Sequence, residues 1–281
     1  MDIAGLLAIA GVLVAIFRRY IQRPARLNNT ADNAILLLWL LFILVTGFLV
    51  EGTRIAATEP AWKTWSPVGA FVGTAFTADA RLWHSMFWWI HMLASFGFIA
   101  YMPFSRLKHI FTSAMNIYLR SQKPRGEIRT IDIENAEIFG VGKINDFSWK
   151  NLLDLDACTS CGRCQDICPA YLSDKPLSPK KLILDLLDNL NEKAPVLLKG
   201  GSLENENPIV GTAVEADEVW SCTTCGACVE ACPVFVEHID KVVELRRDRV
   251  LMEGDFPAEL NQTFKGMENN FNRQRVSTLF K

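Results

Sequence analysis

Three long apolar runs in the first 104 residues constrain the fold more than any other feature of the sequence. They lie near residues 3–20, 34–52 and 82–104, and each approaches the ~20 apolar residues that a helix needs to cross a bilayer. The same 104 residues hold only seven of the 29 Lys/Arg and five of the 31 Asp/Glu. Because the rest of the chain is charged, the sequence excludes both a single soluble domain and a protein wholly buried in lipid. The net charge of -2, without a basic stripe, also argues against nucleic acid as a partner.

Charged residues at the ends of the runs predict the topology. Only Asp2 precedes the first run and four arginines follow it, which is the wrong charge order for a cleaved signal peptide. By the positive-inside rule the first loop is cytoplasmic, and Arg106 and Lys108 return the chain to that side after the third run. The four arginines are Arg18, Arg19, Arg23 and Arg26. We expect the apolar segment 67–77 to be interfacial or re-entrant, because about eleven residues are too few for a fourth span.

Three of the four histidines lie in or beside the third run, at positions 84, 91 and 109. Imidazoles are costly in lipid and tend to mark function. His91 and His109 are 18 residues apart, so on a regular helix they would share one face ~27 Å apart, near opposite sides of a bilayer. That spacing suits one axial ligand for each of two stacked b-type haems, with His84 as a further candidate on the same face. The alternative is that His84 and His109 are interfacial and His91 is hydrogen-bonded between helices.

The charged part of the chain contains a duplicated cysteine motif. Cys-x2-Cys-x2-Cys-x3-Cys-Pro occurs at residues 158–169 and again at 222–233, and it uses all eight cysteines. This is the pattern of ferredoxins with two 4Fe-4S clusters, in which the fourth cysteine of each motif binds the other cluster. The alternative is a pair of structural zinc sites. It is disfavoured because zinc takes its four ligands in two pairs, which does not explain four closely spaced cysteines occurring twice. Metal ligation in place of disulfides also indicates a reducing compartment.

The crossing of the fourth cysteines defines two groups of predicted ligands. The first cysteine set is Cys158, Cys161, Cys164 and Cys232, and the second cysteine set is Cys222, Cys225, Cys228 and Cys168. Gly162 and Gly226, each just after the second cysteine of a motif, are expected to let the backbone approach a cluster closely.

Cys168 and Cys222 are 54 positions apart, and an interval of this length requires an inserted helix. Ser178 and Pro179 predict its N-cap and first residue, and an amphipathic run follows as far as Leu190. A second helix is predicted over 234–252, with His238 on its surface. This arrangement resembles the α-helical ferredoxin of the iron-sulfur subunits of heterodisulfide reductase, succinate dehydrogenase and glycolate oxidase. The expected fold is therefore all-α, with a transmembrane helix bundle at 1–110, a linker at 111–150, an α-helical ferredoxin domain at 151–255 and a tail at 256–281.

The third apolar run resembles the last span of the membrane cytochrome b subunit of respiratory nitrate reductase and heterodisulfide reductase. Members of that family have five spans, and histidines in the positions of His91 and His109 are haem ligands. Here neither of the other two runs contains a His or Met to supply the second axial ligands. The resemblance therefore implies that the chain begins at the family's third span, either as a fragment or beside a further membrane subunit. The residues that carry it are Arg81-Leu82 and Pro103-Phe104-Ser105-Arg106-Leu107-Lys108-His109-Ile110.

A cytochrome b followed by a helical ferredoxin resembles the membrane iron-sulfur oxidoreductases that link electron-transfer flavoprotein to menaquinone. Those proteins continue into cysteine-rich domains for which this chain has no cysteine left. The resemblance implies electron transfer between a soluble redox protein and the quinone pool, through two 4Fe-4S clusters and one or two haems b. It also implies the cytoplasmic membrane of a prokaryote, with the ferredoxin domain on the cytoplasmic side. The alternatives are the membrane arm of a heterodisulfide or sulfite-reduction complex, and a haem-free membrane-anchored ferredoxin. No nucleophile, acid/base pair or nucleotide-binding loop indicates a complete catalytic site.

Overall fold

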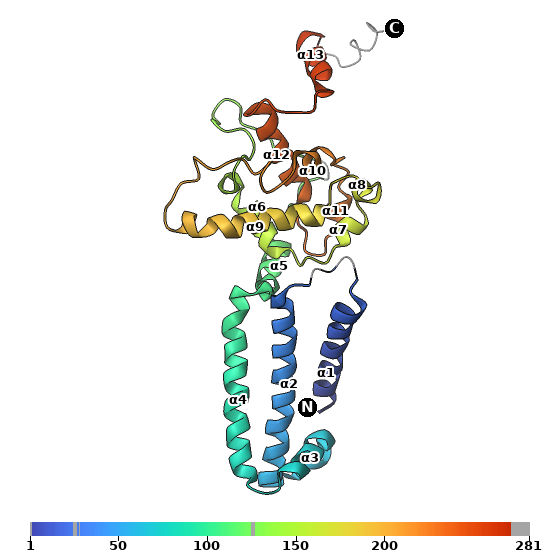
Figure 1. Ribbon diagram of the computed structural model, residues 1–281, viewed down its shortest axis with the longest axis vertical. Coiled ribbons are helices and arrows are strands. Elements are labelled where there is room, and N and C mark those ends of the chain that lie inside the picture. Colours follow the sequence, from blue (N-terminus) through green and yellow to red (C-terminus); the bar gives the residue numbers. More distant parts are fainter. Residues whose placement is uncertain (1, 25–26, 28, 125–126, 271–281) are drawn as a thin grey trace. The chain divides into compact units, whose positions relative to one another are not determined.

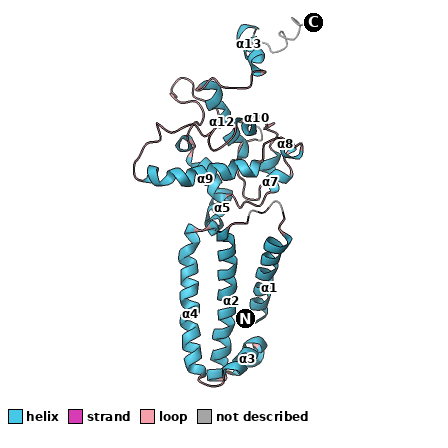
Figure 2. Ribbon diagram, viewed as in Figure 1, coloured by secondary structure: helices cyan, strands magenta, loops and turns pink. Residues whose placement is uncertain are grey.

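The computed structural model describes residues 2–270 except 25, 26, 28, 125 and 126, and its secondary-structure elements in this range are helices joined by loops. The chain divides into two compact units: the first unit ends at Lys108, and the second unit begins at His109. Figure 1 shows the helices of each unit, and Figure 2 shows that no strand occurs in the described part of the chain. The prediction of an all-α fold is therefore confirmed. Arg26 and residues 271–281 of the predicted tail lie outside the described residues.

Three helices of the first unit are long and apolar enough to cross a membrane, as the sequence predicted. They cover Asp2–Gln22, Ala31–Thr58 and Ala80–Phe104. The first is α1, Asp2–Ile16, extended by a π-helical turn, Phe17–Gln22. The second is α2, and the third is α4, Ala80–Tyr101, extended by a 3₁₀ turn, Met102–Phe104. Their apolar side chains are largely exposed, which is costly in water and favourable in lipid.

Helices α2 and α4 pack against each other in a seven-residue register. Thr53 faces His84, Thr46 faces His91, and Trp39 packs edge-on against Phe98. Each step of seven residues along α2 matches a step of seven in the opposite direction along α4. Two helical turns bring a residue back to nearly the same face, so one seam of α2 meets one seam of α4 along their length. The Trp39 indole also donates to the Ala94 carbonyl at 3.1 Å.

The short apolar segment between α2 and α4 forms α3, Pro67–Gly73, followed by a 3₁₀ turn, Thr74–Phe76. As predicted, it is too short to be a span. It packs closely on α2, where a Cβ on Gly73 would stand 2.6 Å from the Gly52 carbonyl oxygen. Only a residue without a side chain fits there. The Asp2 carboxylate accepts from the Val68 N–H at 2.6 Å, so an acid from α1 caps the N-terminus of α3.

The helix expected to carry both His91 and His109 is interrupted, which corrects the spacing argument. After α4 and its 3₁₀ turn, Ser105 is extended (φ -103°, ψ 176°), and α5 begins only at His109. Pro103 explains the break because it lacks an N–H and its ring clashes with the preceding turn. Asp32 stabilises the break by accepting from the Arg106 N–H at 3.2 Å. The two histidines therefore do not project from one regular helix, and the ~27 Å separation does not follow.

The second unit is a set of helices packed around one hydrophobic core. Leu155, Ile183, Leu186, Val219 and Leu245 are fully buried in it. The predicted linker, 111–150, contributes most of α5, His109–Tyr118, which packs on α6. It also contributes Ile144, which is buried in the same core. The later helices are α6 Trp149–Ala157, α7 Arg163–Asp166, α8 Pro169–Leu172, α9 Pro179–Leu198, α10 Ala216–Trp220, α11 Ala227–Glu230, α12 His238–Leu251 and α13 Leu260–Asn270.

The two helices predicted around the second motif are present with changed limits. Helix α9 begins as predicted, because Ser178 Oγ accepts from the Lys181 N–H at 3.2 Å, but it continues past Leu190 to Leu198. Helix α12 begins at His238, four residues later than predicted. His238 is 3% exposed, so the prediction of a surface histidine is wrong.

Candidate cofactor sites

The two cysteine motifs have the same backbone. In each, the residue before the second cysteine is left-handed, with φ of 52° at Ser160 and 53° at Thr224. The residue after it is left-handed too, with φ of 81° at Gly162 and 78° at Gly226. A short helix, α7 or α11, then carries the third cysteine. Left-handed serine and threonine cost of order 1 kcal/mol each, and such strain concentrates at ligand sites. The backbone thus repeats as the sequence does.

Thiols of the first cysteine set lie near one another. Burial raises the pKa of Cys158 to about 11, and Cys232 and Cys161 are close enough to raise it further. Burial raises the pKa of Cys164 to about 12, with Cys158, Cys228, Cys232 and Cys161 adding to the shift. Cys232 comes from the second motif, so the neighbours of Cys158 and Cys164 include the fourth cysteine of the other repeat.

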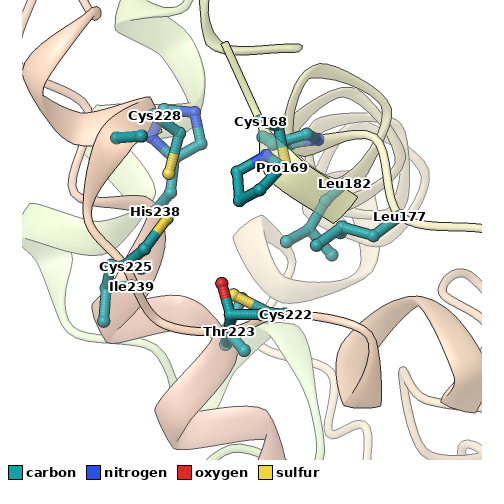
Figure 3. Close-up of a pocket in the computed structure, with 13 residues that line it drawn as sticks. Cys168, Pro169, Leu177, Leu182, Cys222, Thr223, Cys225, Cys228, His238 and Ile239 are labelled. Carbon is teal, nitrogen blue, oxygen red and sulfur yellow. The ribbon is translucent and has the colours of Figure 1, made fainter. Parts of the chain in front are cut away.

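The four cysteines of the second cysteine set line a single cavity. Cys222, Cys225 and Cys228 come from the second motif and Cys168 from the first. Figure 3 shows their sulfur atoms around the same space, with Pro169 and Thr223 beside them. Burial raises the pKa of Cys228 to about 12, and the neighbouring thiols of Cys222 and Cys168 contribute. The structure therefore brings this group of four together from both repeats.

The chemistry of these cysteines fits iron-sulfur clusters. High pKa values keep closely spaced thiols protonated until a metal supplies positive charge, and cluster ligands are thiolates. Backbone donors that would stabilise the thiolates are in place, since Thr224 N–H points at Cys222 Sγ (3.4 Å) and Val236 N–H at Cys232 Sγ (3.3 Å). Among the described residues, no three His, Cys, Asp or Glu side chains converge on one point as ligands of a single ion would. A four-iron cluster needs no such convergence, because each thiolate binds a different iron atom.

Arg246 of α12 holds the loop that starts the second motif. Its guanidinium donates to the carbonyl oxygens of Val219 (2.7 Å) and Cys222 (2.6 Å), and it lies 5.2 Å from the centre of the Trp220 ring. The positive charge therefore lies beside the first cysteine of that motif. Sequence reasoning noticed Arg246 only as a basic residue late in a helix, because a separation of 24 residues from Cys222 gives no local signal.

His238 lines the same cavity as the second cysteine set. Its Nδ1 lies 2.9 Å from the Val236 carbonyl, and a carbonyl only accepts, so Nδ1 carries the proton. Burial lowers the pKa of His238 to about 4, and the Lys241 charge contributes. The imidazole is therefore neutral at physiological pH, and it closes the cavity on the side of α12.

In the first unit His91 of α4 makes a hydrogen bond with Thr46 of α2. The Thr46 hydroxyl lies 2.9 Å from the Phe42 carbonyl and 3.0 Å from His91 Nδ1. A hydroxyl that donates to the carbonyl accepts from His91 Nδ1–H, which is the tautomer suited to a metal ligand. Nε2 is then unprotonated and able to bind a metal, with the second-neighbour hydrogen bond that metal-ligating histidines usually have. Thr46 was not predicted, although its spacing of seven from Thr53 equals that of His84 from His91.

His84 has the same tautomer, because its Nδ1 lies 3.2 Å from the Val50 carbonyl. His84 and His91 both face α2, so they cannot approach one haem iron from opposite sides. His109 lies at the first position of α5, in the second unit. The structure thus brings His84 and His91 onto one seam and places His109 on another helix.

A cavity of about 830 Å³ lies against His91. This is within the range of small-molecule and cofactor sites. Small residues on one side create the space, namely Ala4, Gly5 and Ala8 of α1, with Gly47 of α2. The cavity is therefore large enough for a haem macrocycle, and His91 is a side chain of the type that binds haem iron. Among the described residues that line it, no second His or Met is present, so these residues would supply one axial position.

Both halves of the chain match known protein families. Residues 2–124 match the family described as nitrate reductase gamma subunit, and residues 150–233 match the 4Fe-4S dicluster domain. The second match contains all eight cysteines. No solved structure matches the chain.

Three curated relatives are similar to the chain. EtfAB:quinone oxidoreductase of Syntrophomonas wolfei is 41% identical over 97% of this chain and 43% of its own length. The probable iron-sulfur-binding oxidoreductase FadF of Bacillus subtilis is 31% identical over 96% of this chain and 44% of its own length. A probable membrane-anchored ferredoxin of Chromohalobacter salexigens is 37% identical over 54% of this chain and 27% of its own length.

The chain spans less than half the length of each of these relatives. The matches confirm the resemblance drawn from the third apolar run and from the cysteine motifs. The chain joins a nitrate reductase gamma subunit domain to a 4Fe-4S dicluster domain. It is homologous to membrane iron-sulfur oxidoreductases that act in electron transfer.

Proposed function

We propose that the chain carries electrons between a soluble redox protein and the quinone pool of a membrane. The observation that carries the proposal is the cavity lined by Cys168, Cys222, Cys225 and Cys228, which both repeats build together. The first cysteine set would hold a second cluster in the same way. A 4Fe-4S cluster supplies a one-electron carrier, and the protein contributes ligands, hydrogen bonds and a low-dielectric surrounding.

The soluble partner is proposed to be electron-transfer flavoprotein, in view of the relative named EtfAB:quinone oxidoreductase. Arginines that follow α1, together with Arg106 and Lys108 after α4, favour a cytoplasmic location for the second unit by the positive-inside rule. We therefore propose the cytoplasmic membrane of a prokaryote as the location. The second unit would then interact with a flavoprotein in the cytoplasm, and the spans of the first unit would interact with a quinone in the bilayer.

A b-type haem is proposed for the first unit. His91 supports it through its hydrogen bond with Thr46 and through the adjoining cavity. His109 and His84 are the other histidines that we propose as candidate haem ligands. A ligand from outside the described residues, or from another subunit, would have to complete the coordination at His91.

The test is anaerobic purification of the full chain from membranes, followed by iron and sulfide analysis and a dithionite-reduced minus oxidised visible spectrum. We expect iron and sulfide for two clusters, together with a b-type haem band. Cys228→Ala should lower iron and sulfide to the content of one cluster. Thr223→Ala is the matched control, since Thr223 lines the same cavity without being a cysteine. Iron without sulfide, or iron content unchanged in Cys228→Ala, would contradict the proposal.

A haem-free membrane-anchored ferredoxin is the second candidate. It is favoured by the relative named as such and by the single haem-ligand-type side chain in the described lining of the His91 cavity. Two clusters without a haem band would support it. Reduction of a quinone analogue by the purified chain, with EtfAB as the electron donor, separates the two candidates further.

A further inference from the structure

One face of α12 extends from the cavity of the second cysteine set to the start of the second motif. His238 and Val242 line that cavity, and Arg246 follows Val242 by four residues. Residues four apart in a helix lie on the same face, one above the other. Arg246 therefore continues the cavity-lining face by one turn. Leu245 beside it is fully buried in the hydrophobic core, which fixes the position of this turn.

The guanidinium of Arg246 binds the backbone on both sides of Ser221. It donates to the Val219 carbonyl at 2.7 Å and to the Cys222 carbonyl at 2.6 Å, with a longer contact to the Trp220 carbonyl at 3.4 Å. Helix α10 ends at Trp220, and the last carbonyls of a helix are commonly capped by a basic side chain. The bond to Cys222 lies beyond that helix. Helix capping therefore explains only part of the arrangement.

The charge of Arg246 is thereby held close to a predicted cluster ligand. Covalent geometry keeps the carbonyl oxygen and Sγ of one cysteine within about 5 Å of each other. Arg246 Nη2, 2.6 Å from the Cys222 oxygen, therefore lies within about 8 Å of Cys222 Sγ. Burial lowers the pKa of Arg246 and the neighbouring Cys222 opposes that change, but a guanidinium stays charged at physiological pH.

An iron-sulfur cluster is sensitive to such a charge. Reduction adds one negative charge to the cluster and its thiolates, so a nearby cation stabilises the reduced form over the oxidised form. Cys222 packs against the hydrophobic core, where a charge is screened less than in water. The Thr224 N–H that points at Cys222 Sγ acts in the same sense.

We propose that Arg246 raises the reduction potential of a 4Fe-4S cluster bound by the second cysteine set, through its charge beside Cys222. This inference rests on the proposed function, since it requires a cluster at that set. In the step concerned, the oxidised cluster takes one electron from a reduced donor, and no bond is made or broken. Arg246 is a positioning residue in this step, because it binds the backbone of a ligand residue and does not itself carry the electron.

The test is a redox titration of the full chain, purified anaerobically in detergent, with both cluster signals followed by EPR. Cys161→Ser and Cys225→Ser, each of which alters one cysteine set, assign the signals. Arg246→Gln removes the charge but keeps an amide that can donate. At a fixed potential its ratio of reduced to oxidised second cluster should fall about 10-fold, a shift of ~59 mV to lower potential. The first cluster should shift less, because Arg246 binds the loop that starts the second motif.

Two further variants separate the charge from the hydrogen bonds. Arg246→Lys keeps the charge but cannot bridge two carbonyls as a guanidinium does, so the second-cluster potential should stay near the parent value even if thermal stability falls. Citrulline in place of Arg246, introduced by nonsense suppression, keeps the shape and N–H groups without the charge. It should lower the potential as Arg246→Gln does, and it tests the charge even if Arg246→Gln loses the cluster.

Arg247→Gln is the matched control. It removes the same charge from the next residue of α12, where the guanidinium pairs with Glu244 at 2.8 Å. Both cluster potentials should therefore stay unchanged in this variant. An equal shift in Arg247→Gln and Arg246→Gln would show that the potential responds to the net charge of the unit and would overturn the inference.

The remaining outcomes separate this inference from the proposed function. A second-cluster potential unchanged in both neutral variants, or lowered equally in Arg246→Lys, would overturn the inference even if the chain still reduced a quinone analogue. The predicted shifts in a chain without such activity would support the inference and refute the proposed acceptor. A purified chain without a cluster at the second cysteine set would refute both.

Discussion

Loss of the buried Lys241 charge should destabilise the second unit strongly. Lys241 Nζ lies 2.6 Å from Asp154 Oδ2, and both side chains are fully buried. Burial alone would raise the pKa of Asp154, but Lys241 and Lys150 hold it below its usual value. The aspartate is therefore ionised and depends on its cations. Lys241→Met would leave that buried charge short of one partner while keeping the bulk of the side chain.

The size of the effect follows from what remains around Asp154. Breaking a buried ion pair by removing one partner costs about 3–5 kcal/mol. Lys150 still lies 2.8 Å from Asp154 Oδ1, and Asn116 and the Glu237 N–H still donate to the carboxylate. We therefore expect the lower end, about 3 kcal/mol. For a unit of this size that corresponds to a fall in Tm of about 6–12 °C.

The assay is thermal unfolding of the purified full chain at pH 7.5, followed by far-UV circular dichroism and by visible absorbance of the clusters. Lys150→Met is the matched control. The Lys150 side chain is 16% exposed, so its loss should cost only about 1 kcal/mol, or about 2–4 °C. Asp154→Asn combined with Lys241→Met should recover much of the stability, because it removes the unpaired charge. A fall in Lys241→Met no larger than in Lys150→Met, or a double variant as unstable as the single one, would refute this reasoning.

Three further predictions concern other parts of the chain. Burial and the neighbouring Glu253 carboxylate raise the pKa of Asp248 to about 6, so the fold favours its protonated form and loses stability as the pH rises from about 4 to 6. The free energy of unfolding of Asp248→Asn should therefore exceed that of the parent chain by about 1–2 kcal/mol above pH 6. In thermal melts this difference should shrink towards pH 4, and a difference that stays constant with pH would argue against the prediction. Gly73→Ala should destabilise the first unit by about 1–3 kcal/mol in detergent melts, whereas Gly11→Ala, with open space around it, should not. Thr46→Val should weaken haem retention about 10-fold or more in a haem titration, and an unchanged affinity would exclude the hydrogen bond to His91 as a support of ligation.

The sequence by itself determined the division of the chain and the chemistry of its two parts. Apolar runs of span length fold as helices because lipid leaves no other way to satisfy the backbone, so α1, α2 and α4 could be placed from composition. The start of α9 could be placed too, because Ser178 followed by Pro179 is a local N-cap signal. Such signals are local, and they were visible without the fold.

Contacts between distant residues were decided only by the tertiary structure. The break after Tyr101 depends on Asp32, some 70 residues away, as well as on Pro103, so the spacing of His91 and His109 gave a wrong geometry. His238 looked like a surface residue because its own helix is polar, yet it closes a cavity made by two other segments. Burial depends on what packs against a residue, and a single sequence does not state that.

The hydrogen bonds from Ser113 and Asn116 of α5 to the Ala157 and Val234 carbonyls, which lie near cysteines of the first set in the sequence, show the same limit. Ser113 and Asn116 are ordinary polar residues in the sequence, and their partners lie 44 and 118 residues away. The cysteine spacing predicts which thiols share a cluster, since that is a property of the motif. Which backbone carbonyls α5 binds is a matter of packing, and only the folded chain decides it.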